Sequence, residues 1–194
     1  MSDTRGTRTH KNLMAAFAGE SGARNRYDYY ASKAQKEGYH QIAAIFRETA
    51  LQESQHAKLW LKYVSSKDGE DVEISATFPA LSIGTTEQNL EAAANGEHEE
   101  FTEMYPTFAK IAREEGFDRI ARSFELIGEV EKSHHARFTK LLQNFREGEI
   151  FVRLDERRWI CLNCGYIHVG KEAPKVCPAC SHPQGYFKLF VEDY

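Results

Sequence analysis

A chain of 194 residues has room for one helical domain of ordinary size and one small domain, and 41% hydrophobic residues are enough to build a core. The formal net charge is −4 and the basic residues are spread along the chain, which argues against nucleic acid as a partner. No apolar run approaches the roughly 20 residues of a membrane span, and residues 1–11 lack the apolar core of a signal peptide. We therefore expect a cytoplasmic protein with no membrane partner.

The first predicted helix follows residues 1–9, which we expect to be disordered. Its inner face consists of residues three or four positions apart: Leu13, Phe17, Glu20, Arg24, Tyr27, Ala31 and Ala34. Gly38 predicts a tight reversal at the end of this helix, because glycine has no Cβ to obstruct it. The next helix, about 40–66, must then run antiparallel to the first.

The second helix has an inner stripe in which Glu53 and His56 stand where apolar residues belong. The stripe follows the same spacing: Ile42, Phe46, Thr49, Glu53, His56 and Trp60. Burying an ionised carboxylate without a partner is very costly. Something inside the bundle must therefore compensate Glu53.

The stretch 67–86 has no periodicity and reads as a long crossover connection, of the kind that ferritin-like bundles contain. Thr86 with Asn89 could cap the third helix, and Pro106 should kink it or remove one backbone hydrogen bond. The inner face of this helix includes two carboxylates: Leu90, Ala93, Glu97, Glu100, Met104, Phe108 and Ile111.

The fourth helix, which ends near Arg146, repeats the pattern of the second 78 residues later. Gly116 makes the reversal before it, as Gly38 does before the second helix. Its stripe has the same spacing: Ile120, Phe124, Ile127, Glu131, His134 and Phe138. Two copies of one helical hairpin, each with a buried Glu-x-x-His, indicate a common site between them.

The composition changes after Gly148. Residues 150–154 and 158–160 have β character, and residues 187–191 offer a closing strand. Between them lie two C-x-x-C pairs, and in a reducing compartment metal binding by these thiols is favoured over disulfides: Cys161, Cys164, Cys177 and Cys180. We expect a bundle domain at 1–148 and a small metal domain at 149–194, with apolar surroundings for the metal from Trp159, Tyr166 and Phe187.

The inward polar side chains of the bundle match the ligand plan of di-iron and di-manganese carboxylate proteins. They are Glu20, Glu53, His56, Glu97, Glu100, Glu131 and His134. Five carboxylates can bridge and neutralise two divalent ions, whereas a zinc hydrolase needs only three protein ligands and an open water. Tyr27 and Tyr105 lie about two turns beyond Glu20 and Glu97, where their hydroxyls could bond ligand carboxylates. The remaining histidines lie off the inner faces, and we expect them at the surface or beside the ligands: His10, His40, His98, His135, His168 and His182.

These motifs together resemble the rubrerythrin family over nearly the whole chain. The resemblance rests on Gly19-Glu20, Glu53-x-x-His56, Gly96-Glu97-x-x-Glu100, Met104-Tyr105-Pro106, Glu131-x-x-His134, and the rubredoxin-like Cys161-x-x-Cys164-Gly-Tyr with Cys177-Pro-x-Cys180. It implies an all-α ferritin-like four-helix bundle with a non-haem di-iron centre, a small β-rich rubredoxin-like domain with one iron on four thiolates, and a homodimer or higher oligomer. It further implies reduction of hydrogen peroxide to water in oxidative-stress defence, with Glu100 and His56 exchanging on one iron.

Several alternatives remain open at this point. Electrons would come from an external rubredoxin or an NAD(P)H-dependent reductase, and the helices could be swapped between chains through residues 67–86. A ferritin-like bundle could instead oxidise and store iron, although a store has no need of an electron inlet. The cysteine spacing also fits a structural zinc ribbon.

Overall fold

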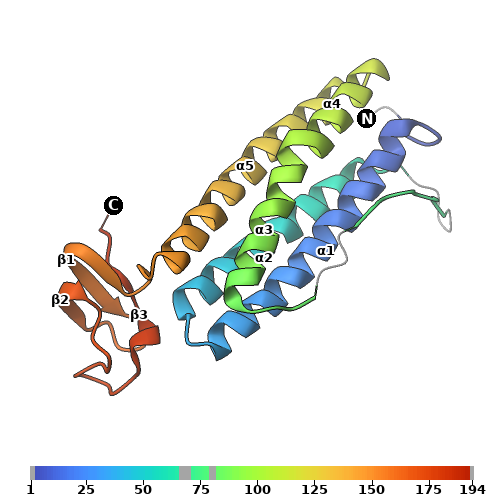
Figure 1. Cartoon of the computed structure of the whole chain (residues 1–194). Coiled ribbons are helices and arrows are strands. Elements are labelled where there is room, and N and C mark those ends of the chain that lie inside the picture. The colour runs from blue at the N-terminus through green and yellow to red at the C-terminus, as the bar shows by residue number, and fades with distance from the viewer. Residues whose placement is uncertain (1–2, 66–70, 79–81, 193–194) are drawn as a thin grey trace.

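The computed structural model describes residues 3–65, 71–78 and 82–192, and its main feature is a bundle of four long rods (Figure 1). The rods are α1 (Arg8–Lys36), α2 (His40–Tyr63), a composite third rod, and α5 (Asp118–Arg146). The third rod consists of α3 (Thr86–Glu99), the π-helical turn η1 (Glu100–Met104) and α4 (Tyr105–Glu114). The predicted helical bundle is confirmed, and α2 ends slightly earlier than expected.

Two glycines make the tight reversals that the sequence predicts. Gly38, between α1 and α2, has φ +84°, and Gly116, between α4 and α5, has φ +82°. This left-handed conformation strains any residue with a Cβ, which explains glycine at both positions. Each reversal sets an antiparallel helix pair and so aligns the Glu-x-x-His helix of that pair with its neighbour.

The N-terminal segment is ordered over its described part, so the expectation of disorder at residues 1–9 is wrong for residues 3–9. Thr4 is 1% exposed, and its backbone N–H donates to the Ser65 side chain beyond α2. Thr7 caps α1 by accepting a hydrogen bond from the His10 backbone, and Glu115 accepts from both the backbone and the hydroxyl of Thr9. These local bonds carry no periodic signal in the sequence.

The third rod begins one residue earlier than predicted. Thr85 is the N-cap and forms a capping box with Gln88, whereas Asn89 bonds the backbone of Gly84. Thr86, which we expected to cap the helix, instead donates its hydroxyl and its backbone N–H to Glu37. The helix start is thereby tied to the end of α1.

The apolar core of the bundle is divided into two clusters along the helix axes. One cluster contains Tyr27 and Phe46, and the other contains Leu13 and Trp60. On α1 the boundary between them falls at Glu20, and on α2 it falls at residues 53–56. A polar layer therefore interrupts the core near the middle of the bundle, and the packed apolar layers above and below fix its position.

The small domain at the end of α5 is a three-stranded antiparallel sheet with strand order β2-β1-β3 (Figure 1). The two β stretches predicted before the first cysteine form one strand, β1 (Val152–Cys161), and β3 (Phe187–Leu189) is the predicted closing strand. The strand β2 (Ile167–Glu172) was not predicted, because its glycine and charged residues weaken the strand signal. Trp159 and Phe187 are fully buried, whereas Tyr166, the third residue expected around the metal, is 37% exposed.

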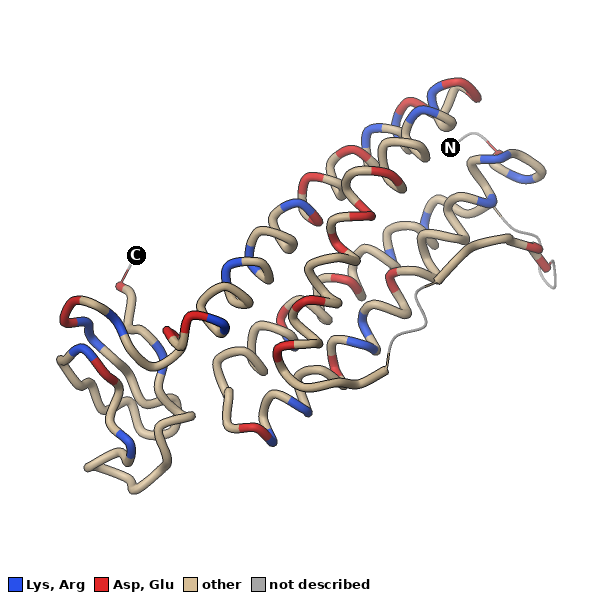
Figure 2. Tube along the Cα trace, viewed as in Figure 1, with Lys and Arg blue, Asp and Glu red and all other residues tan. Residues whose placement is uncertain are grey.

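The sheet domain contacts the bundle at the reversal between α1 and α2. The ring of His40 lies 3.9 Å from that of Tyr186, and the Tyr39 ring is stacked on Phe151 at 6.1 Å. Acidic and basic residues are interspersed along the helices and the sheet (Figure 2). Among the described residues, no helix is long and apolar enough to cross a membrane.

Candidate metal centres

The polar layer of the bundle contains two groups of four side chains that could each hold a metal ion. One group is Glu20, Glu53, His56 and Glu131, and the other is Glu53, Glu97, Glu131 and His134. Within each group the candidate ligand atoms lie within 4.8 Å of one another. Every member is buried, and the most accessible, His56, is only 7% exposed.

The first group converges on the Nδ1 atom of His56. This nitrogen lies 2.8 Å from Glu53 Oε2, 3.0 Å from Glu131 Oε1 and 3.6 Å from Glu20 Oε2. A single N–H can point at only one of three oxygens. A cation that accepts lone pairs from all four atoms suits this arrangement better than a proton does.

The second group repeats this geometry around Nδ1 of His134. The nitrogen lies 2.8 Å from Glu131 Oε2, 3.1 Å from Glu53 Oε1 and 3.8 Å from Glu97 Oε2. Glu53 and Glu131 therefore give one oxygen to each group, whereas Glu20 and Glu97 serve one group each. With two metal ions bound, Glu53 and Glu131 would be shared between them, and Glu20 and Glu97, here called the terminal carboxylates, would each serve one.

The hydrogen bonding of this cluster is incomplete without a cation. Six of its buried atoms have no hydrogen-bond partner: Glu20 Oε2, Glu53 Oε1, Glu97 Oε2, both carboxylate oxygens of Glu131 and His134 Nδ1. The Glu53 and Glu131 oxygens among them lie within 3.1 Å of an imidazole nitrogen but make no hydrogen bond to it, and buried carboxylate oxygens without hydrogen bonds are unfavourable. Since all six atoms belong to the two groups, a pair of divalent metal ions fits the residues present.

Each of the two tyrosines predicted near the cluster donates a hydrogen bond to the terminal carboxylate on the other helix pair. Tyr27 of α1 donates to Glu97 Oε1 of α3 at 2.5 Å, and Tyr105 of α4 donates to Glu20 of α1. The Trp60 indole also donates to Glu20, at 3.4 Å. Each terminal carboxylate thus keeps one oxygen bonded to protein and presents the other to the metal position.

The π-helical turn explains how Tyr105 reaches this place. Tyr27 follows Glu20 by seven positions, whereas Tyr105 follows Glu97 by eight. Within η1 the backbone N–H of Tyr105 donates to Glu100 O, five residues back, so the turn absorbs one extra residue. The distortion of the helix that we expected at Pro106 is thus the π-helical turn just before this proline. It brings Tyr105 to a position equivalent to that of Tyr27.

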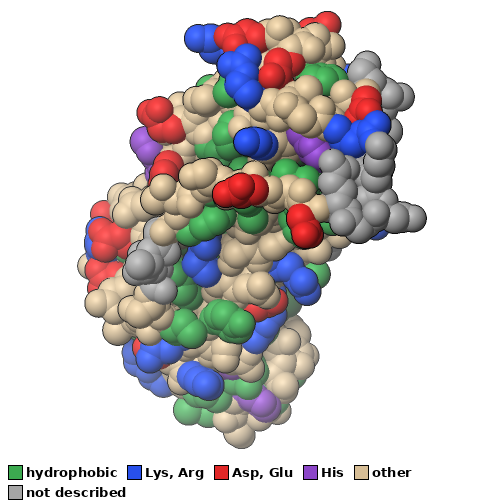
Figure 3. Space-filling model, turned by 90° about the vertical axis from the view of Figure 1, so that its right-hand side faces the viewer, with side chains coloured by type: hydrophobic (Ala, Val, Ile, Leu, Met, Phe, Trp, Pro, Cys, Tyr) green, Lys and Arg blue, Asp and Glu red, His purple; other side chains and the backbone are tan. Residues whose placement is uncertain are grey.

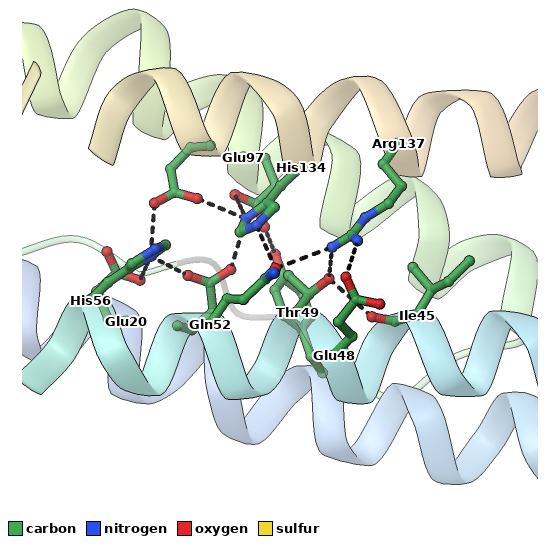
Figure 4. A network of polar contacts seen from close by, with 12 residues as sticks. Glu20, Ile45, Glu48, Thr49, Gln52, His56, Glu97, His134 and Arg137 are labelled. Carbon is green, nitrogen blue, oxygen red and sulfur yellow. Dashed lines mark hydrogen bonds and ion pairs between the residues drawn. The ribbon is translucent and has the colours of Figure 1, made fainter. Parts of the chain in front are cut away.

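A chain of polar side chains behind the cluster orients His134 (Figure 4). The Nε2 atom of His134 lies 2.9 Å from Gln52 Oε1, which also accepts from Arg137 Nη2 at 3.4 Å. Arg137 is held in turn by Thr49 at 2.5 Å and Glu48 at 2.7 Å. Because Gln52 Oε1 is a hydrogen-bond acceptor, the proton of the neutral His134 imidazole must be on Nε2. The lone pair of Nδ1 is then available to a metal ion. Gln52 and Arg137 could not be identified from the sequence, because single polar residues beside the inner face of a helix form no distinctive pattern.

Glu100 stands apart from the other predicted ligands. It belongs to neither group of four, and it lies at the start of η1 on the wall of a pocket. Burial and repulsion by Glu20 raise the pKa of its carboxyl well above the usual range, so it faces the same concentration of negative charge. The structure brings six of the seven predicted bundle ligands together and leaves Glu100 beside them.

The crowding of carboxylates around two imidazoles shifts several pKa values. Although burial opposes it, close contacts with Glu131, Glu53 and Glu97 raise the pKa of His134 to about 11. The pKa of His56 is raised for the same reason. Burial raises the pKa of Glu97 to about 8, and that of Glu20 well above the usual range. Without a metal, the cluster therefore holds several protons at neutral pH.

The four cysteines form a second compact site in the small domain. The Sγ atoms of Cys161 and Cys180 are 3.7 Å apart, as are those of Cys164 and Cys177. A tetrahedron with metal–sulfur bonds of about 2.3 Å has edges of about 3.8 Å, so the spacing suits one metal ion. The backbone N–H of His182 lowers the pKa of Cys180 to about 6, whereas, against the effect of the Tyr166 backbone, hydrogen bonding to Cys180 raises the pKa of Cys164 to about 12. Without a metal the four sulfurs therefore share protons that ligation would displace.

Among the histidines outside the cluster, the position of His10 differs from the expectation. His10, expected at the surface or beside the ligands, is 3% exposed near the start of α1, because the ordered N-terminal segment covers it. His98 is exposed, and its ring lies 5.2 Å from that of His135, which bonds the Ala94 carbonyl.

Facing Glu-x-x-His helices and single carboxylates on the other two rods define a ferritin-like di-iron carboxylate bundle. Residues 11–142 match the Rubrerythrin family, and residues 159–188 match the rubrerythrin, rubredoxin-like domain. The chain belongs to the rubrerythrin family. A di-iron site with Glu and His ligands and a four-cysteine rubredoxin-like site are the cofactor sites of this chain, as predicted.

Individual relatives agree with this family over the full length. The chain is 51% identical over 195 residues to Rubrerythrin-1 of Clostridium acetobutylicum, with all of both chains covered. It is 51% identical over 189 residues to Rubrerythrin of Nitratidesulfovibrio vulgaris, with 97% of each chain covered. The solved structure of fully reduced nigerythrin (all ferrous) matches with a TM-score of 0.64 at 32% identity, over 97% of this chain and 92% of that chain.

The raised histidine pKa values predict that metal binding expels protons. In protein whose bundle alone has been emptied by a chelator, anaerobic titration with Fe²⁺ at pH 7 should release about two or more protons per chain, from His56, His134 and neighbouring carboxyls. Because protons compete with the metal, affinity should rise with pH. Calorimetry in buffers of different ionisation enthalpy measures the release, and a pH-independent affinity without proton release would contradict the electrostatics described here.

Proposed function

We propose that this protein reduces hydrogen peroxide to water in oxidative-stress defence, with electrons entering through the four-cysteine site. The observation that carries the proposal is the sharing of Glu53 and Glu131 between two adjacent metal positions, in a chain that also has an electron-carrier type of domain. When bound, the bundle irons supply the two electrons that break the O–O bond, and the four-thiolate iron supplies single-electron transfer. Two protons complete the two water molecules.

The chain is proposed to work as two units, residues 1–148 and 149–194. The six clustered side chains of the bundle would hold two irons, and the four cysteines would hold the third. Tyr27 and Tyr105 would fix the orientation of the terminal carboxylates, because each bonds one carboxylate oxygen. Gln52 would fix the tautomer of His134. Buried apolar layers on both sides keep bulk water from the site.

Glu100 and His56 are proposed to alternate as ligands at one metal position. In the described geometry His56 faces the cluster and Glu100 stands outside it. A more highly charged metal pair favours an additional carboxylate, whereas a reduced pair is better matched by neutral imidazole. The position of Glu100 on a π-helical turn supports this role, since such turns are rare and occur often at functional sites.

Electron delivery is proposed to occur between chains of a homodimer or higher oligomer. Along α2, the contact residue His40 and the cluster residue His56 are 16 positions apart, which is about 24 Å of helix. Electron transfer slows steeply with distance, so a chain's own small domain is poorly placed to reduce its own bundle. A partner chain packed in the opposite direction would bring its four-cysteine domain alongside the cluster, with or without exchange of helices through 67–86.

An external rubredoxin or NAD(P)H-dependent reductase is the proposed electron donor, and a cytoplasmic setting is proposed because reducing conditions keep metal-binding thiols available. Iron oxidation and storage is the second candidate, since bacterioferritins share the fold at 18–19% identity. The four-cysteine domain favours peroxide reduction, because iron storage needs no electron inlet. A structural zinc ion in that domain would favour iron oxidation and storage.

The electron inlet can be tested by Cys177→Ser. This substitution removes one thiolate from the four-cysteine site, and steady-state peroxide turnover with an external reductase should fall to background. A chemically reduced bundle in the same variant should still consume peroxide in a single turnover, because the bundle ligands are untouched. Reductase-driven turnover at the wild-type rate would show that electrons enter elsewhere.

The role of Glu100 can be tested by Glu100→Ala against Glu103→Ala, which removes an exposed carboxylate from the same π-helical turn. Glu100→Ala should still bind two irons in the bundle, since six ligands remain, but the reduced protein should react with peroxide at least about tenfold more slowly. Glu103→Ala should react like wild type. Rapid mixing of each reduced protein with peroxide measures the rates, and equal rates for both variants would make Glu100 a bystander.

A further inference from the structure

The bundle and the small domain are joined covalently by one short segment, residues 147–151. A single connection leaves the relative orientation of two domains free unless contacts between them hold it. On the face seen in Figure 3, apolar side chains appear between charged side chains of both signs, as is usual for a solvated surface. The contact between the two domains is more specific, because it joins the loop that carries Gly185 to the turn that carries Gly38.

Gly185 packs directly on the backbone of Gly38. A Cβ built on Gly185 would lie 2.1 Å from the Gly38 carbonyl oxygen and 2.9 Å from the carbonyl carbon. Both atoms belong to the backbone of a tight reversal, so they cannot swing aside as the end of a side chain can. Carbon and oxygen atoms in contact are normally about 3.3 Å or more apart, so any larger residue at position 185 would push the domains apart by roughly 1 Å.

The close approach is also directional. In glycine, the bond that would carry Cβ carries a hydrogen atom, and at Gly185 this hydrogen points toward the Gly38 oxygen. Such Cα–H···O contacts are individually weak but recur where two backbones pack closely. Gly185 therefore both removes an obstacle and favours one orientation of the small domain on the α1–α2 reversal.

Aromatic rings extend the contact beyond the two glycines. Tyr186 lies against the ring of His40, and Phe151 is stacked on Tyr39. Tyr39 also packs on Phe145 near the end of α5, with ring centroids 4.9 Å apart. A contact made at several points resists rotation, so the small domain is held in one orientation on its own bundle.

The loop that contains Gly185 also supports both C-x-x-C pairs. The carbonyl of Tyr186 accepts a hydrogen bond at 2.7 Å from the backbone of Leu162, inside the first pair. The carbonyl of His182 accepts one at 2.8 Å from the backbone of Cys177, in the second pair. These bonds tie the sulfur atoms to the loop. The orientation set at Gly185 is therefore also the orientation of the four-cysteine site.

We propose that Gly185 is a positioning residue for electron delivery, because its contact with Gly38 sets the direction in which the four-cysteine site faces. The inference rests on the proposed function, in which that site reduces the bundle of a partner chain. In each transfer one electron leaves the four-thiolate iron, which is oxidised, and enters the bundle site, which is reduced. A small domain held firmly on its own bundle presents its metal to the partner in one defined place. Since electron transfer slows steeply with distance, a displaced domain slows this step selectively.

The test compares Gly185→Ala with Gly170→Ala in the same domain. A Cβ on Gly170 would meet Nε2 of His168 at 2.7 Å, and this atom is the far end of a side chain that can turn away. Reduced, iron-loaded protein is mixed with hydrogen peroxide, and the returning visible absorption of the oxidised four-thiolate iron reports electron transfer to the bundle. Gly185→Ala should slow this return at least about tenfold, and Gly170→Ala should keep the wild-type rate.

Two further measurements separate positioning from a general loss of structure. The reaction of the reduced bundle with peroxide and the reduction of the four-thiolate iron by the external reductase should be unchanged in Gly185→Ala. Cleavage by a Glu-specific protease at Glu147 and Glu149, in the connection between the domains, should be several-fold faster in Gly185→Ala than in wild type or Gly170→Ala. Cleavage reports docking without any turnover.

If Gly185→Ala loses its four-thiolate iron, His40→Ala takes its place, because it loosens the same contact from the bundle side and leaves the cysteine loops intact. In the variant that keeps its irons, a wild-type transfer rate, or a slower rate with unchanged proteolysis, would overturn this inference alone. Wild-type protein that does not consume hydrogen peroxide would overturn the proposed function instead.

Discussion

The structure depends on the burial of carboxylates in the middle of a helical bundle. Glu20, Glu53, Glu97 and Glu131 are each at most 1% exposed, and leaving such groups ionised and unpaired would cost several kcal/mol each. Apolar layers on either side prevent the helices from moving apart to admit water. Protons compensate the charge in the metal-free protein and metal ions compensate it in the loaded protein. The fold is therefore coupled to metal binding at its centre.

The two halves of the bundle are nearly symmetric, and their differences are concentrated near one metal position. Glu53 and Glu131 each belong to both candidate metal groups, and Tyr27 and Tyr105 bond the opposite terminal carboxylates. The π-helical turn allows this equivalence despite one extra residue in the third rod. The same turn carries Glu100, whose counterpart three positions after Glu20 on α1 is the buried Ala23. One side of the site thus has an additional acidic group and an adjoining pocket.

Much of this arrangement could be predicted from the sequence, because buried charges are improbable in a regular apolar stripe. The repeated Glu-x-x-His and the two C-x-x-C pairs identified both metal sites. Periodicity could not locate features that depend on tertiary contacts or on single local bonds. The Gln52–Arg137 chain, the ordered N-terminal segment and the strand β2 were therefore missed. Helical spacing placed Glu100 on the inner face with the other ligands. A uniform 3.6-residue period cannot represent the π-helical turn that leaves Glu100 outside the two groups of four.

The metal content of iron-replete, anaerobically purified protein tests the central claim most directly. We expect about three irons per chain, two in the bundle and one on the four cysteines, with the visible and EPR spectra of a four-thiolate iron beside a di-iron pair. Glu53→Ala removes a carboxylate shared by both metal positions, so it should lose the bundle irons and keep the thiolate iron. A single metal per chain, or zinc alone, in the wild-type protein would contradict the account.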